Sequence, residues 1–102
     1  MFKQLPRQEF AELLEDPEYT LIDVRADSER EKYGQIRDNQ LHLEYSMLFF
    51  KSKLSDLDTT KKYLIYCWHG QRSEASRNIM QELWFSWVCD LEGGIHEWNK
   101  AK

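Results

Sequence analysis

Apolar residues in this chain form short runs that alternate with segments of helical periodicity. Two runs, Thr20 to Val24 and Lys62 to Tyr66, are rich in β-branched or aromatic residues and stop abruptly at polar ones or at Cys67. Runs of this length and composition predict buried strands. The run from Trp87 to Leu91 has the same character, whereas Phe2 to Leu5 predicts only a brief edge strand.

Helical spacing fills the intervals between these runs. The longer segments, with the apolar residues that mark them, are Pro6 to Glu15 (Phe10, Leu13, Leu14), 47 to 57 (Met47, Phe50, Leu54, Leu57) and the stretch after Arg72 (Ala75, Ile79, Met80, Leu83, with Glu74, Arg77, Asn78 and Gln81 facing water). Shorter elements are a helix between Arg25 and Lys32 ended by Gly34, a strand at Leu41 and Leu43, and a helix from Ile95 to Lys100 anchored by Trp98.

Strands that alternate with helices predict an α/β fold of three layers, in which a mostly parallel sheet of four to five strands is covered by helices on both faces. With 102 residues, 41% of them apolar and 14% aromatic, residues 1–102 fit a single domain. In such sheets the functional groups gather beyond the carboxyl ends of the strands. Cys67 follows one strand and Arg25 follows another.

Charge and composition restrict the partners and the compartment. A net charge of −4 without long charged runs argues against a nucleic-acid partner. Neither a signal peptide nor a run long enough to span a membrane is present, so we expect a cytoplasmic protein with no membrane partner. A reducing compartment favours free thiols at Cys67 and Cys89, and Cys89 lies in an apolar strand where packing is its expected role. His42 and His96 have no ligands at metal spacing, and we expect no metal and no cofactor.

Cys67 is the residue with the clearest chemical setting. It is followed by a loop, residues 68 to 71, and by a helix that begins near Arg72 and Ser73. A loop that closes onto a helix N-terminus directs several unpaired backbone N–H groups into one concavity, which can bind an anion. We expect these groups and the charge of Arg72 to stabilise the Cys67 thiolate, which predicts a nucleophile. The alternative is an inert buried cysteine at a strand end.

Neighbouring loop residues allow more than one interpretation. Arg72 could be an ordinary surface arginine, but a cation in the first turn opposes the helix dipole, a cost that a bound anion would offset. Ser73 satisfies backbone donors or contacts the substrate, and both roles stay open. We expect His69 to shape the loop rather than to transfer protons, and Trp68 to wall or cover the pocket.

Three motifs together resemble the rhodanese family of sulfurtransferases. The segment Cys67-x-x-Gly70-x-Arg72-Ser73 resembles its active-site loop, 21 to 25 resembles its Asp-Val-Arg strand, and 88 to 98 resembles its closing Leu-x-Gly-Gly-x-x-x-Trp segment. The family order is kept over nearly the whole chain. Departures occur at 34 to 39, which lacks the usual Pro-Gly, and at Trp84, where a helix-ending glycine is common and a different C-cap is therefore expected.

The resemblance implies that sulfane sulfur passes from thiosulfate or a persulfide donor, including a protein persulfide, to a thiol or cyanide through a Cys67 persulfide. It implies that the substrate is bound by Trp68, His69, Gly70, Gln71, Arg72 and Ser73. Phosphatases of this fold have five residues between cysteine and arginine, whereas four separate Cys67 from Arg72, which disfavours phosphatase activity. The alternative is a non-enzymatic sulfur carrier or an interaction module that docks through Leu48 and Phe49.

Two residues of the Asp-Val-Arg segment are predicted to support the site. We expect Asp23 to bind backbone groups near the loop and Arg25 to pair with a carboxylate such as Glu29 or Glu31. The aromatic residues Trp84, Phe85, Trp87 and Trp98 are expected to belong to the core.

Overall fold

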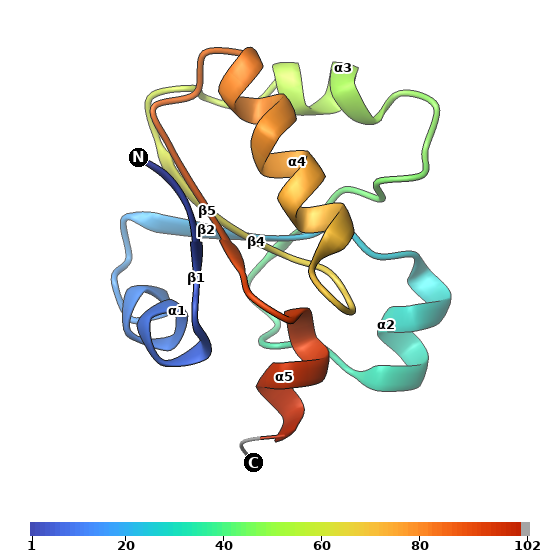
Figure 1. Cartoon of the computed structure of the whole chain (residues 1–102). Helices are drawn as coiled ribbons and strands as arrows, with labels where there is room; N and C mark the ends of the chain where they lie inside the picture. Colours follow the sequence, from blue (N-terminus) through green and yellow to red (C-terminus); the bar gives the residue numbers. More distant parts are fainter. Residues whose placement is uncertain (101–102) are drawn as a thin grey trace.

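Strands and helices alternate along the chain in the computed structural model, which describes residues 1–100 (Figure 1). The strands are β1 (Phe2–Leu5), β2 (Tyr19–Asp23), β3 (Leu41–His42), β4 (Lys62–Tyr66) and β5 (Trp87–Leu91). The helices are α1 (Arg7–Leu14), α2 (Asp27–Tyr33), α3 (Phe50–Ser55), α4 (Gln71–Glu82) and α5 (Gly94–Lys100). Within residues 1–100, no helix combines the length and the apolar character needed to span a membrane.

The five strands form one sheet in the order β1-β5-β4-β2-β3, and every neighbouring pair is parallel. The α/β fold predicted from the alternation is therefore confirmed, with β1 at one edge as expected. Because all strands point the same way, their carboxyl ends meet at one edge of the sheet. Cys67 after β4 and Arg25 after β2 lie at that edge, since Asp23 and Tyr66 are register partners.

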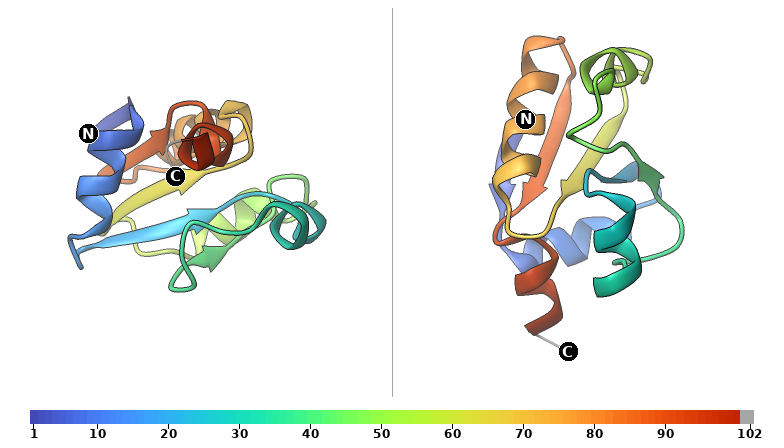
Figure 2. Two further views of the ribbon diagram at one scale, coloured as in Figure 1. Left: turned by 90° about the horizontal axis from the view of Figure 1, so that it is seen from below. Right: turned by 90° about the vertical axis from the view of Figure 1, so that its right-hand side faces the viewer.

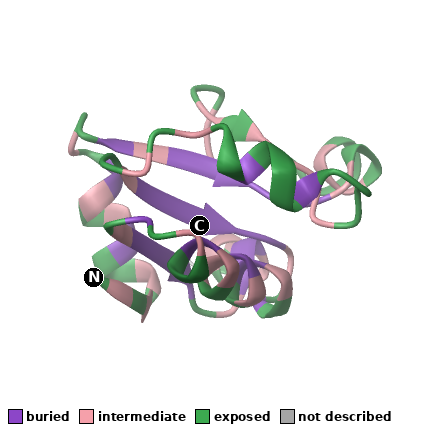
Figure 3. Ribbon diagram, turned by 90° about the horizontal axis from the view of Figure 1, so that it is seen from above, coloured by how far each residue is buried: buried purple, intermediate pink, exposed green. Residues whose placement is uncertain are grey.

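Side chains alternate across the sheet and form two apolar layers. On one face Leu21, Leu64 and Leu91 pack with residues of α1 and α5; on the other, Ile22, Ile65 and Val88 pack with residues of α3 and α4. Figure 3 shows the result as buried strands between helices whose outer sides are exposed. Helix α2 has no buried residue and lies toward the carboxyl ends of the strands (Figures 1 and 2).

Helix α4 differs from its predicted apolar stripe. Of the four stripe residues Met80 is buried and Ala75, Ile79 and Leu83 are partly buried. Two serines, Ser73 and Ser76, are fully buried instead. The prediction that Arg77 faces water is wrong, because its Nη1 lies 2.8 Å from Oδ1 of the fully buried Asp90 on β5. A buried carboxylate needs such a partner, and the sequence spacing within one helix cannot reveal it.

Helix α3 is shorter than the predicted segment 47 to 57. The N–H of Met47 donates to the Glu44 carbonyl and that of Phe50 to the Met47 carbonyl, so the chain makes turns rather than a helix before Phe50. Leu48 is 88% exposed and Phe49 62% exposed. Both therefore form the exposed apolar surface that the sequence suggested, whereas docking at that surface stays a prediction.

Trp84 ends helix α4 in a way that the sequence did not predict. It was expected in the core and is 87% exposed. Its N–H donates to the Gln81 carbonyl and the N–H of Phe85 to the Met80 carbonyl, which is a Schellman cap. Trp84 occupies the left-handed position of this cap, with φ 67°. Trp84 thus takes the position that glycine usually occupies in this cap. The expectation of a different C-cap is wrong.

Replacing Trp84 by glycine is expected to raise the free energy of unfolding by about 1 kcal/mol, because a side chain in the left-handed region costs roughly 1–2 kcal/mol. The exposed indole loses little packing. Urea denaturation of Trp84→Gly and Trp84→Ala measures the effect, since alanine keeps the strained Cβ and should give no comparable gain. Equal stabilisation by both variants would show that backbone strain is not the cause.

Candidate active site

The loop between β4 and α4 places the Cys67 sulfur against the N-terminus of α4. Cys67 is 1% exposed, and its Sγ accepts the N–H of Gly70 at 3.0 Å and lies 3.4 Å from Oγ of Ser73. Gly70 is the N-cap of α4 and has φ 110°, a value that lets the chain turn tightly from the cysteine into the helix. The structure therefore brings together three of the residues predicted for this site.

Ser73 is fully buried beneath the loop. Its hydroxyl donates to the Gly70 carbonyl at 3.2 Å, so the side chain satisfies a loop backbone group while its oxygen faces the sulfur. Ser76, one turn further, donates to the Arg72 carbonyl at 2.7 Å. Both hydroxyls fix the first turns of α4, which keeps the N–H end of the helix in place below Cys67.

Arg72 is paired with Glu29 of α2. Its Nη1 lies 2.7 Å from Oε1 and its Nη2 2.6 Å from Oε2, a bidentate pair that joins α4 to α2. The Arg72 hydrogen bonds are the main reason that the pKa of Glu29 is lowered, and Glu29 in turn raises the pKa of Arg72. The prediction that Glu29 or Glu31 pairs with Arg25 is wrong, because Glu29 pairs with Arg72 of α4 and Arg25 pairs with Asp23.

Asp23 is the partner of Arg25. Oδ1 of Asp23 accepts the backbone N–H of Arg25 at 2.9 Å and its Nε at 3.0 Å, while Nη2 lies 2.8 Å from Oδ2. Both side chains are fully buried, and the Tyr66 hydroxyl also donates to Oδ2. Burial and the charge of Asp23 raise the pKa of Tyr66 to about 12, so this hydroxyl stays protonated. Arg25 also binds the Gly34 carbonyl at 2.7 Å, which fixes the end of α2.

The start of α5 holds the loop from the other side. The N–H of Ile95 donates to the Cys67 carbonyl at 2.9 Å and that of His96 to the Trp68 carbonyl at 3.1 Å. In the sequence, Gly93 and Gly94 predict a turn before the last helix and belong to the closing family motif. The structure shows that this turn brings the N-terminal N–H groups of α5 onto two loop carbonyls.

Aromatic rings cover the outer side of the loop. The Trp68 ring stacks on Tyr33 of α2 with centroids 4.2 Å apart, so it walls the loop toward α2. The His69 and His96 rings lie 4.8 Å apart. Gln71 begins α4 and is exposed; with His69 and Gly70 it borders a hollow of about 240 Å³. Of the residues predicted to bind substrate, Trp68 thus packs toward α2, whereas His69, Gly70 and Gln71 border the hollow.

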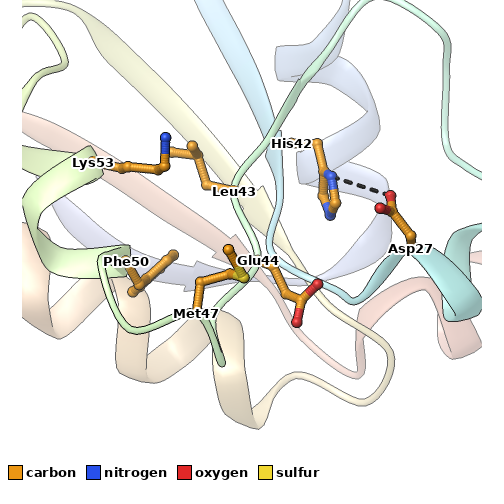
Figure 4. Close-up of a pocket in the computed structure, with 7 residues that line it drawn as sticks. All are labelled: Asp27, His42, Leu43, Glu44, Met47, Phe50 and Lys53. Carbon is orange, nitrogen blue, oxygen red and sulfur yellow. Dashed lines mark ion pairs between the residues drawn. The ribbon is translucent and has the colours of Figure 1, made fainter.

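A separate cavity of about 260 Å³ lies beside β3 (Figure 4). It is lined by Asp27, His42, Leu43, Glu44, Met47, Phe50 and Lys53. Nδ1 of His42 faces Oδ1 of Asp27 at 3.5 Å, and Nε2 of His42 contacts the Arg25 carbonyl. Residues 67 to 73 contribute nothing to this lining, so the cavity is separate from the candidate site at Cys67.

The parallel sheet and its loop define a class of small α/β protein, one with a buried cysteine whose sulfur lies against a helix N-terminus. Within that class, this chain belongs to the family of rhodanese-like domains, whose model matches residues 6–101. The family resemblance drawn from three sequence motifs is confirmed.

Several single-domain relatives match over nearly their whole length. The thiosulfate sulfurtransferase GlpE of Coxiella burnetii is 33% identical over 100 residues, which cover 97% of this chain and 89% of that protein. GlpE of Pseudomonas savastanoi is 32% identical over 99 residues, covering 96% and 88%. A crystal structure of a rhodanese-related protein from Thermoplasma volcanium is similar with a TM-score of 0.80 and 29% identity, covering 98% of this chain and 93% of that one.

Proposed function

We propose that this protein is a sulfurtransferase that moves sulfane sulfur from thiosulfate or a persulfide donor to a thiol or cyanide through a Cys67 persulfide. The observation that carries the proposal is the 3.0 Å hydrogen bond from the Gly70 N–H to Cys67 Sγ at the start of α4. A thiolate held by backbone N–H groups at a helix N-terminus is a good nucleophile. The relatives named thiosulfate sulfurtransferase support the same reaction class.

In the first half-reaction the Cys67 thiolate attacks the outer sulfur of thiosulfate. A sulfur–sulfur bond forms to Cys67, the bond to the inner sulfur breaks, and sulfite leaves with the electron pair. In the second, a thiolate or cyanide attacks the outer sulfur of the persulfide and the Cys67 thiolate is released. Backbone N–H groups of the loop stabilise the anionic sulfur in both steps, and two half-reactions predict ping-pong kinetics.

The short loop favours sulfur over phosphate. Four residues separate Cys67 from Arg72, and Gly70 already approaches the sulfur at 3.0 Å. A loop this short suits one sulfur atom better than a tetrahedral phosphoryl group. The second candidate function is a sulfur carrier or interaction module, which the exposed Leu48 and Phe49 support.

Brief exposure of the reduced protein to thiosulfate is expected to add the mass of one sulfur atom to the intact chain. Peptide mass mapping should locate that sulfur on Cys67, and Cys89→Ser should gain it equally, because Cys89 is buried and burial raises the pKa of its thiol. Addition of a thiol or cyanide should remove the sulfur, and renewed exposure to thiosulfate should load it again over several cycles. Sulfur found on Cys89 would contradict the mechanism, and loading without turnover would favour the carrier.

A further inference from the structure

The carboxylate of Glu29 binds the guanidinium group of Arg72, which is the group that an anionic donor would bind. Both of its carboxylate oxygens contact Arg72, at 2.7 and 2.6 Å. Parallel contacts from two N–H groups to two oxygens are also the way in which a guanidinium binds an oxyanion such as thiosulfate. The side chain of Glu29 therefore takes the place of a bound oxyanion on Arg72.

Other arginines at this edge of the sheet are paired as well. Arg25 is paired with Asp23, and both are fully buried. Arg30 lies 3.3 Å from both Asp23 and Asp27. The positive charges of Arg25, Arg30 and Arg72 are thus each balanced by a carboxylate of the same chain, in a protein whose net charge is −4. These three arginines therefore offer no unbalanced charge to a donor with two negative charges, which must rely on the backbone N–H groups at the start of α4.

Glu29 is held in position by more than Arg72. Its Oε1 also accepts the N–H of Ala26 at 3.1 Å, a hydrogen bond that caps the start of α2. The other end of α2 is fixed where Arg25 binds the Gly34 carbonyl. An incoming oxyanion must therefore compete with a carboxylate that is anchored on a fixed helix.

We propose that Glu29 determines donor specificity by occupying Arg72, so that the site takes alkyl persulfides in preference to the thiosulfate dianion. This inference rests on the proposed sulfurtransferase function. An alkyl persulfide presents its outer sulfur to Cys67 without an oxyanion group that needs the guanidinium. The Cys67 thiolate attacks that sulfur, a new sulfur–sulfur bond forms, the donor's own sulfur–sulfur bond breaks, and the alkyl thiolate leaves with the electron pair. Charge and electrons balance without an oxidant.

The test compares initial rates of sulfur transfer to a thiol acceptor from thiosulfate and from ethyl hydropersulfide, an alkyl persulfide without a carboxylate. Glu29→Gln removes the charge but keeps an oxygen that can accept from Arg72 and from the Ala26 N–H. Its KM for thiosulfate is expected to fall about tenfold with kcat within about twofold, because one opposing charge is removed beside a dianion. The constants for ethyl hydropersulfide should stay within about twofold of wild type, because this donor has no oxyanion to place on Arg72. Glu31→Gln, the same charge change at an exposed position of α2, is the matched control and should resemble wild type.

A higher thiosulfate KM or a lower kcat in Glu29→Gln would overturn the inference, because Glu29 would then position Arg72 rather than compete for it. An equal gain with both donors, or the same gain in Glu31→Gln, would overturn it as well, by showing a general charge effect. Failure of the proposed function looks different: wild-type protein would then transfer sulfur from neither donor, and both proposals would fall together.

Discussion

Replacing Cys67 by serine is expected to abolish sulfur transfer, lowering turnover from thiosulfate to a thiol by about 1,000-fold or more. A serine hydroxyl at this position is neither ionised at neutral pH nor able to form the persulfide. The fold should persist, because oxygen can still accept the Gly70 N–H that sulfur accepts in the native protein. Steady-state rates with purified Cys67→Ser measure the loss directly.

Cys89→Ser provides the control for this experiment. Cys89 is also fully buried, but it packs within β5 on the face covered by α1 and α5, away from the loop. Its replacement changes stability and should leave the turnover of the folded protein close to that of wild type. Retention of more than a tenth of wild-type turnover by Cys67→Ser would refute the covalent mechanism, since no other described thiol approaches the helix N-terminus.

A methyl group on Gly94 is expected to lower the free energy of unfolding by about 3 to 5 kcal/mol and sulfur transfer by about 100-fold. Its Cβ would lie 2.3 Å from the Trp68 carbonyl oxygen and 2.5 Å from that of Cys67, so the loop backbone must move. Gly94 also has φ 64°, which disfavours a side chain. The same displacement breaks the hydrogen bonds from α5 to the loop, and denaturant unfolding with enzyme assays of Gly94→Ala tests both effects.

Gly93→Ala is the matched comparison. Gly93 has a similar φ of 75°, but a Cβ there meets the Cγ and Cβ atoms of Glu97 within α5 and does not meet the loop carbonyls. We expect about 1 to 2 kcal/mol of destabilisation from the backbone and a further cost from displacing Glu97, with sulfur transfer within about threefold of wild type because the loop carbonyls are not contacted. Similar losses in both variants would mean that left-handed strain, rather than contact with the loop carbonyls, explains the effect of Gly94→Ala.

Strands and helices were predictable where the residue pattern of a single segment is enough to identify it. The central strands β2, β4 and β5 are compact apolar runs, and their positions match to within about one residue because strands buried on both faces need apolar residues throughout. Helix α3 was predicted too long, because Met47 has helical spacing but no partner to bury it. Trp84 was misplaced for a related reason, since an aromatic residue indicates burial only when the chain directs it inward.

Contacts at the candidate site were also predictable only where they are made within one short segment. The relation of Cys67 to Gly70 and Ser73 follows from a strand, a short loop and a helix in sequence, and local geometry alone brings them together. The ion pairs between charged residues could not be predicted from the local sequence. Arg25 pairs with Asp23, Arg72 with Glu29 and Arg77 with Asp90, and these pairs were either assigned to other carboxylates or not foreseen.

The sequence by itself therefore determined a parallel α/β sheet and a cysteine at a helix N-terminus, because periodicity, glycine placement and helix-end electrostatics act over a few residues. Tertiary structure decided what surrounds that cysteine: Glu29 on Arg72, and the N–H groups of α5 on the loop carbonyls. These contacts join segments far apart in the chain. Several carboxylates could neutralise each arginine equally well, and only the packing of α2, α4 and α5 around the carboxyl ends of the strands selects one.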